Sequence, residues 1–410
     1  MNENFLTAYK LKISTLSPVH VGCGEDYEPT NYVIDDGMLY AFSPALLMAT
    51  LKPEQRDELS RALGIRNPIS AVQRFFFANK EAAKAIASHH VPVISAAEQF
   101  YARRVGQVAN LEQDGQAVIN KLEIARTAYN PVNGLPLLPG SSLKGAMRTA
   151  VLEAWRGGRT FPLPFHFKAK EANSKAKEME ETILRGSFKT DPLRLLKVGD
   201  AMFRPGSYKA INTKGEEIQI ERQARSILFQ ANRKKRPHPD PSKNDKDMAN
   251  LLECVPASQP WAFTGEIVIE QKANQGKEKE TPNRQIGVQF LAQVCNAFYG
   301  EQFQKELSIL ENNKYVSSTW ASRAKKRLAA DGLWGKLIAE DKGFLLRVGR
   351  HSGAESITID APRRIRINKG PGKKPDYAEE TTKLWLAANH PDARSDMHPF
   401  GWVFVQLDPA

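Results

Sequence analysis

The mid-chain segment 138–149, LPGSSLKGAMRT, combines residue types suited to holding an anion. A Pro-Gly turn leads into a predicted helix, whose first backbone amides lack intrahelical partners and attract negative charge. Two basic side chains four positions apart share one face of that helix, and a glycine between them leaves room for close approach. The candidate phosphate-binding residues are Gly140, Ser141, Ser142, Lys144, Gly145 and Arg148.

The same segment also fits a capped amphipathic helix, with Ser141 or Ser142 as the N-cap and two exposed basic residues. It is not a Walker phosphate loop, because Lys144 precedes Gly145 and no Gly-Lys-Ser/Thr occurs. A phosphometabolite enzyme built on this loop would need a paired acid and base, and no such signature is present.

A second candidate is the turn 348–353, VGRHSG, in which two glycines bracket Arg350 and His351. Such a turn can form a nest of backbone amides around a phosphate, although many glycine turns bind nothing. A third candidate is 16–24, LSPVHVGCG, a strand followed by a glycine turn. His20 alternates there with two valines, which fits a structural histidine, an RNA contact or a general base.

Positive charge is concentrated in two stretches of the chain. The protein carries 58 Lys and Arg against 46 Asp and Glu, a net charge of +12. Residues 221–246 contain eight basic and three acidic residues, and residues 345–375 contain eight and two. Charge gathered in this way favours contact with a phosphate backbone, whose neutralisation releases counterions. The alternative is a pair of solvated loops, and it is the favoured interpretation for 231–248.

The elements that must position these candidates are mixed helices and strands. Alternation predicts a strand over 9–16, and Asp36-Gly37 predicts a hairpin turn within 31–42. Ser43-Pro44 starts a helix that Pro53 interrupts and Gly64 ends, and a second helix follows from Asn67-Pro68. Further strands are expected at 119–128, 264–270 and 399–407, with helices after 141 and over 284–299 and 318–330. No strict βα alternation occurs, so the sequence predicts an α+β fold with insertions.

Length and composition exclude several classes of protein. The 410 residues are 41% hydrophobic, which allows a sizeable core. No apolar run is long enough to span a bilayer, and three widely spaced cysteines fit a reducing cytoplasm. No Cys-x-x-Cys pair occurs, so we expect neither a structural metal nor a cofactor.

Four motifs together resemble the RAMP superfamily of CRISPR effector proteins. They are SPVHVGCG near residue 17, PGSSLKGAMRT from 139, RVGRHSG from 347 and PFGWV from 399. Their order and spacing are most similar to the fifth-subunit family of the type III-A Csm complex. The stretches 44–118, 160–195 and 231–260 carry no matching motif.

The resemblance implies a ferredoxin-like, RRM-type core over 1–43, 119–230 and 261–410. It also implies a helical insertion at 44–118 and a β-hairpin thumb, for which 271–283 is the candidate; 231–260 is predicted to be a mobile basic loop. The partners that the resemblance implies are crRNA, target RNA, the backbone RAMP subunit and the small helical subunit, with no membrane. The implied RNA-binding residues add His20, Arg222, Arg225, Arg347, Arg350 and His351 to those of 140–148.

The implied function is a non-catalytic, cytoplasmic crRNA-binding subunit that caps the filament at the crRNA 3′ end and serves antiviral defence. The cleaving relatives carry an aspartate after their glycine turn, whereas this chain has Asp26 and Glu28 nearby but not convincingly on that position. These two acids could hold a metal or form a solvated turn. The alternative function is a metal-independent endoribonuclease that processes precursor crRNA, with His20 as its base.

Overall fold

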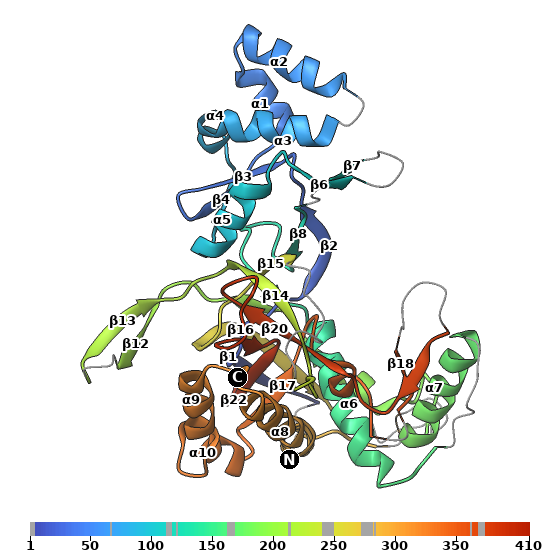
Figure 1. Ribbon diagram of the computed structural model, residues 1–410. Helices are drawn as coiled ribbons and strands as arrows, with labels where there is room; N and C mark the ends of the chain where they lie inside the picture. Colours follow the sequence, from blue (N-terminus) through green and yellow to red (C-terminus); the bar gives the residue numbers. More distant parts are fainter. Residues whose placement is uncertain are drawn as a thin grey trace.

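A seven-stranded antiparallel sheet lies at the centre of the computed structural model (Figure 1). Its order is β17-β22-β1-β16-β11-β9, with β10 also paired to β16. The strands are β1 (Leu6–Thr15), β9 (Leu137–Leu138), β10 (Leu196–Val198), β11 (Ala201–Phe203), β16 (Gln259–Glu270), β17 (Gly343–Arg347) and β22 (Trp402–Pro409). The structure describes residues 5–65, 68–111, 117–119, 122–161, 169–211, 215–239, 250–271, 282, 284–360, 363–367 and 374–410.

The period-two pattern of β1 places Leu11 and Ile13 fully inside the core. Strands β16 and β22 flank β1, so the beginning and the end of the chain share the middle of the sheet. This agrees with the strands predicted near 9–16, 264–270 and 399–407.

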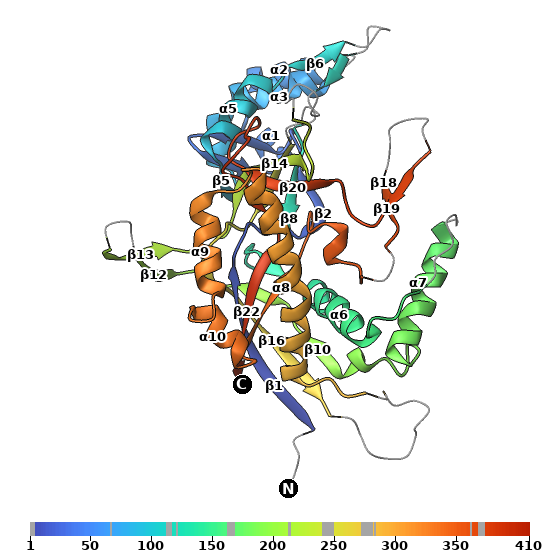
Figure 2. The ribbon, with the colours of Figure 1, turned by 60° about the horizontal axis from the view of Figure 1, so that its bottom comes forward.

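Helices cover this sheet, and α8 (Val288–Asn312) runs along it beside α6 (Gly140–Arg156) (Figure 2). The buried hydroxyl of Tyr299 in α8 donates to the carbonyl of Ala146 in α6 at 3.0 Å, which ties the two helices together. The structure also describes helices after α6 in the chain, namely α7 (Ala169–Leu184), α9 (Ser318–Leu328), α10 (Leu333–Ala339) and the short 3-10 helices η1 (Pro192–Leu195) and η4 (Ala354–Ser356).

A second sheet of six strands lies beside the first, in the order β2-β8-β15-β14-β20-β21. Its strands are β2 (Gly22–Tyr27), β8 (Ile124–Thr127), β14 (Ser226–Lys234), β15 (Asn250–Cys254), β20 (Lys383–Ala388) and β21 (His398–Pro399). Both sheets contribute to one large hydrophobic core. The fold is therefore α+β, as the sequence predicted.

The region 44–111 emerges from the second sheet and carries most of the N-terminal helices (Figure 1). It packs partly around its own apolar cluster, which includes Leu47, Phe75 and Phe76. Its elements, with the preceding hairpin, are β3 (Tyr32–Asp35), β4 (Met38–Ala41), α1 (Pro44–Thr50), α2 (Pro53–Leu63), α3 (Pro68–Ala78), α4 (Lys80–Ala85), β5 (His89–Pro92), α5 (Ser95–Arg104), β6 (Val108–Leu111) and, beyond 111, β7 (Ala117–Ile119). The turn at Asp36-Gly37 and the helix break at Pro53 occur where predicted.

One expectation needs correction, and another lies outside the described residues. The segment 231–260 is not one loop, because its ends belong to β14, β15 and β16, and residues 240–249 lie outside the described part of the chain. Composition did not predict these strands, because Ala231 to Lys234 pair with β20, a strand about 150 residues away in the chain. The expected thumb at 271–283 lies almost wholly outside the described residues. Among the described residues, β12 (Ser207–Ile211) and β13 (Glu217–Glu221) form a hairpin that projects from the body (Figure 1).

Candidate functional site

Three loops that are distant in sequence meet at one point, where the two sheets adjoin. The backbone amide of Arg350 donates to the carbonyl of His20 at 2.8 Å, and that of Gly401 donates to Pro18 at 2.8 Å. The amide of Val348 in turn donates to Gly401 at 2.9 Å. Backbone hydrogen bonds therefore join three motifs, SPVHVGCG, RVGRHSG and PFGWV, into one cluster of loops.

Two glycines allow the loops of this cluster to approach one another closely. Gly349 has φ +84°, and a Cβ added there would lie 2.3 Å from the carbonyl oxygen of His20. Gly401 has φ +85°, and its added Cβ would lie 2.2 Å from the carbonyl oxygen of Val348. A side chain at either position would both strain the backbone and force the loops apart.

A groove of about 580 Å³ opens on one side of this cluster of loops. Its walls come from the first turns of α6, the β1–β2 loop and the stretch after β17, namely Val21, Gly22, Ser142, Gly145, Ala146, Thr149, Arg347, Val348, Gly349, Arg350, Ser352, Ser356 and Ile357. The turns at 139–149 and 347–353 thus face the same groove. This juxtaposition links the two segments that the sequence singled out for anion binding.

Arg350 is the exposed basic residue of the groove wall. Within the described residues its guanidinium has no hydrogen bond or ion pair to another side chain. Opposite α6, it leaves a positive charge beside the hydroxyls of Ser142 and Thr149. Thr149 was not a predicted site residue, although positions 142, 145, 146 and 149 have the i, i+3, i+4, i+7 spacing of one helical face.

Lys144 and Arg148 are on a different face of α6 and do not line this groove. Lys144 Nζ donates to the carbonyl of Leu196 at 2.8 Å, and burial lowers the pKa of this amine. Arg148 forms ion pairs with Glu180 at 2.7 Å and Asp191 at 2.6 Å. The two cations hold α6 to its neighbours, which differs from the expected open phosphate contact.

The N-terminus of α6 already holds an internal anion. The helix begins at Gly140 with Pro139 as its N-cap, so neither Ser141 nor Ser142 caps it. The amide of Gly140 donates to the carboxylate of Asp200 at 2.7 Å, as the helix dipole favours. A Cβ added at Gly140 would lie 2.2 Å from the carbonyl oxygen of Val198, so this buried glycine serves close packing.

Three of the predicted RNA-binding arginines are internal. Arg347 pairs with Glu306 at 2.8 Å, and the same carboxylate accepts from the indole of Trp402 at 2.7 Å. Arg222 donates to the carbonyls of Pro260, Gly206 and Ser207, which fastens the β12–β13 hairpin to the core. Arg225 joins the buried network described next. Their guanidinium groups are paired or hydrogen-bonded within the fold, and of the three only Arg347 also lines the groove.

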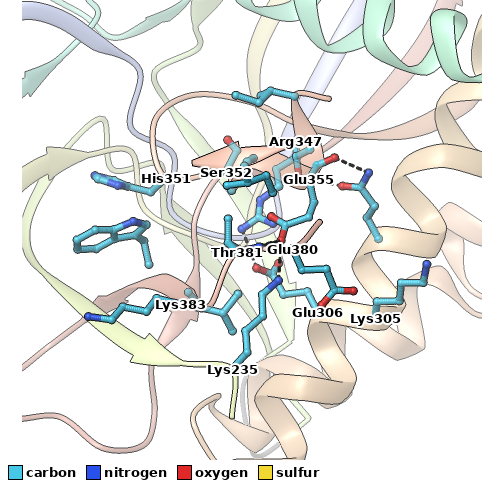
Figure 3. Close-up of a pocket in the computed structure, with 18 of the residues that line it drawn as sticks. Lys235, Lys305, Glu306, Arg347, His351, Ser352, Glu355, Glu380, Thr381 and Lys383 are labelled. Atoms are coloured by element: carbon cyan, nitrogen blue, oxygen red, sulfur yellow. Dashed lines mark hydrogen bonds and ion pairs between the residues drawn. The ribbon is translucent and has the colours of Figure 1, made fainter. Parts of the chain in front are cut away.

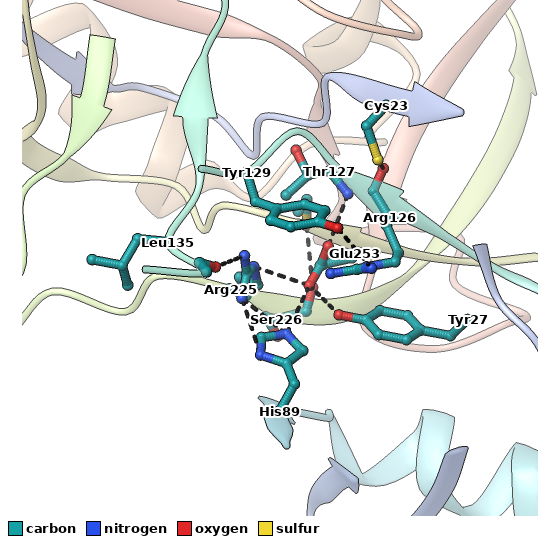
Figure 4. A network of polar contacts seen from close by, with 12 residues as sticks. Cys23, Tyr27, His89, Arg126, Thr127, Tyr129, Leu135, Arg225, Ser226 and Glu253 are labelled. Atoms are coloured by element: carbon teal, nitrogen blue, oxygen red, sulfur yellow. Dashed lines mark hydrogen bonds and ion pairs between the residues drawn. The ribbon is translucent and has the colours of Figure 1, made fainter. Parts of the chain in front are cut away.

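Glu253, fully buried in β15, is the centre of a polar network (Figure 4). Its carboxylate accepts from the hydroxyl of Tyr27 at 2.8 Å and the amide of Thr127 at 2.8 Å, and lies 3.1 Å from Nε of Arg225. These donors, the cation and nearby His89 lower the pKa of Glu253 against the opposing effect of burial. The network joins β2, β8, β14 and β15.

His20 is also buried, with an exposed fraction of 0%. Its Nδ1 lies 2.6 Å from the carbonyl oxygen of Glu253, so this nitrogen carries the proton and Nε2 holds the lone pair. Burial lowers the pKa of the ring, which is therefore neutral. Asp26 lies in β2 and Glu28 directly after it. Among the described residues, no three His, Cys, Asp or Glu side chains are grouped to hold a metal ion.

A second cavity, of about 770 Å³, opens on the other side of the stretch 347–357 (Figure 3). His351 was expected to line the same groove as Arg350, but it lines this second cavity. Trp385 of β20 lines the cavity too and was not among the predicted residues. The alternating pattern of KLWLAA placed Trp385 on an outward position, which was the available sequence signal.

Fold and groove together define an α+β protein whose glycine loops and one exposed arginine line a surface groove. Residues 12–335 match the RAMP superfamily, and the chain belongs to it. No helix in the described ranges is long and apolar enough to cross a membrane.

Three known proteins are similar to this chain. A curated protein of Methanocaldococcus jannaschii, named CRISPR system Cms protein Csm5, is 22% identical over 210 residues. That match covers 50% of this chain and 45% of the relative, so the chain spans about half the length of the relative it matches. A chain in the cryo-EM structure of a type III-A Csm–crRNA–target RNA ternary complex has a similar fold, with a TM-score of 0.52 and 16% identity, covering 98% of this chain and 100% of that one. The crystal structure of T. onnurineus Csm5 gives a TM-score of 0.49 at 16% identity, covering 96% and 99%.

Proposed function

We propose that this chain is a crRNA-binding subunit of a type III-A CRISPR effector complex and that it binds the guide backbone in the groove between α6 and 347–357. The observation that carries the proposal is the convergence of 21–22, 142–149 and 347–357 on one hollow in a RAMP fold. The hydroxyls of Ser142 and Thr149 and the Arg350 guanidinium suit phosphate and sugar contacts, which need no base readout.

The subunit has a structural and not a catalytic task in this proposal. A general base must reach the proton that it removes. The His20 ring is buried inside the cluster of loops and cannot reach a strand in the groove. The groove therefore holds RNA without a residue in place to cleave it. The similarity to Csm5 and to a chain of a crRNA-containing complex supports a place at the crRNA 3′ end, next to the backbone subunit, the small helical subunit and target RNA, in the cytoplasm.

The test compares two arginines with different surroundings. Arg350→Ala removes the exposed guanidinium from the groove, so we expect weaker crRNA binding and a salt dependence reduced by about one phosphate contact. Arg148→Ala removes the same charge from α6, but from a side chain already paired with Glu180 and Asp191. This control should retain the salt dependence of the wild type.

Filter binding with labelled crRNA over a series of salt concentrations gives both slopes. Equal slopes for Arg350→Ala and the wild type would contradict the groove assignment. A crRNA carrying a photoreactive group at its 3′ end should crosslink to this chain in the assembled complex, whereas a 5′ group should not. Crosslinking from the 5′ end alone would contradict the capping position.

A further inference from the structure

The cavity behind 347–357 adjoins the groove directly. Arg347, Gly349, Arg350, Ser352, Ser356 and Ile357 line both hollows, so one stretch of chain forms the wall between them. Figure 3 shows this wall above α8, with His351 at one end of the cavity and the Lys235–Glu355 pair farther along. A strand held in the groove therefore passes the mouth of the cavity at Arg350.

Two aromatic rings stand at this end of the cavity. The centroids of His351 and Trp385 are 5.4 Å apart, with 46° between their planes. Trp385 keeps 37% of its surface exposed, so part of its indole is open to a ligand. His351 is held at φ +72°, a backbone conformation that a non-glycine residue seldom adopts. The His351 ring also packs against that of Phe400, with 5.3 Å between the centroids, which fixes it beside the indole.

The neighbouring strand supplies an amide. Asn232 lies opposite Trp385 in the β14–β20 register and also lines the cavity. Its Oδ1 is buried and has no hydrogen-bond partner among the described residues. An amide of this kind can pair with the polar edge of a base.

Charged side chains line much of the cavity, and Lys383 lies at the same end as His351 (Figure 3). Glu355 is paired with Lys235 at 2.7 Å and also accepts from Thr381, so these charges cancel within the wall. Burial lowers the pKa of His351 to about 4, so its ring carries no charge near neutral pH. Arg350 remains at the mouth to meet a phosphate. A flat ring can therefore stack on the neutral His351 ring inside the cavity, while an anionic group meets Arg350 outside.

We propose that the cavity receives one unstacked nucleobase of the RNA strand bound in the groove, with its face against Trp385 and His351. Single-stranded RNA is commonly held by splayed bases that stack on aromatic side chains. The cavity volume is within the range of small-ligand sites, and the phosphate of the same nucleotide would lie at Arg350. The inference rests on the proposed function and specifies how the strand is anchored.

An abasic scan of the guide tests the inference with the full chain. A series of crRNAs, each lacking one base, is titrated against the wild type, Trp385→Ala and Trp385→Phe. We expect one position at which loss of the base weakens wild-type binding about five- to a hundredfold. Trp385→Ala should bind intact RNA with a similar loss and should show no additional loss at that position, whereas Trp385→Phe should keep the effect.

Trp261 supplies the control. It is 40% exposed and lies near Lys12 and Gln406, away from both hollows. Trp261→Ala should leave the abasic profile unchanged. A wild-type profile without a sensitive position, or one whose sensitive position ignores Trp385, would overturn the inference while crRNA binding itself still supports the proposed function. Absence of crRNA binding by the wild type would overturn both, and the wild-type and Trp385→Phe profiles decide the matter if Trp385→Ala does not fold.

Discussion

Gly145 offers a substitution that should raise stability and lower RNA affinity at once. It lies inside α6, where glycine costs about 1 kcal/mol relative to alanine. A Cβ added at this position would meet no atom within 4 Å. Gly145→Ala should therefore stabilise the folded protein, because it restricts the unfolded chain and strains nothing in the native one.

RNA binding should instead favour glycine over alanine at position 145. Gly145 is exposed on the groove wall between Ser142 and Thr149, so a methyl group there would project toward the bound strand. If the backbone approaches α6 closely, the methyl group must displace it. We expect the free energy of unfolding to rise by about 0.5–1 kcal/mol and the crRNA affinity to fall about tenfold, which corresponds to about 1.4 kcal/mol.

The control for Gly145→Ala is Gly300→Ala. Gly300 also lies inside a helix, α8, and its added Cβ would likewise meet no atom within 4 Å. It lines neither hollow. Chemical denaturation should give similar stabilisation for both variants, and filter binding at fixed salt should show weaker binding for Gly145→Ala alone. Equal affinities for the two variants would refute the close approach to α6.

Two further predictions concern the buried charges. Glu253→Gln keeps the shape of the side chain but removes the partner of Arg225, so it should cost about 3 kcal/mol of unfolding free energy in denaturant titrations; a cost below about 1 kcal/mol would contradict the central role of this carboxylate. Lys235 and Thr381 lower the pKa of Glu355 to about 2, against an ordinary value of 4.5. A depressed carboxyl pKa stabilises the fold above the ordinary value, so up to about 3 kcal/mol should be lost as the pH falls from about 4.5 to 2. Acid titration of Glu355→Gln should lack this part of the loss, and identical acid profiles would contradict the assignment.

Local chemistry made several elements predictable from sequence. The hairpin at Asp36-Gly37 follows from two residues that tolerate positive φ, observed at 50° and 71°. The break between α1 and α2 follows from Pro53, which begins the second helix. The strands β1 and β22 follow from period-two alternation.

The candidate site was predictable in its segments but not in its side chains. The glycine turn at 349 and the loop–helix at 139–149 were both identified, and both line the groove. The roles of Lys144 and Arg148 could not be predicted, because their partners Leu196, Glu180 and Asp191 are 32 to 52 positions away in the chain.

The sequence by itself determined which segments have unusual backbone freedom and where strands and helices begin, because these properties depend on neighbouring residues. Only the tertiary structure decided which charges remain available to a ligand. Burial and distant partners neutralised Arg347 and Arg148 and left Arg350 exposed. The tertiary structure also brought His351, from the turn after β17, beside Trp385 of β20. A charge or ring becomes a binding group through what surrounds it, and those surroundings come from residues far away in sequence.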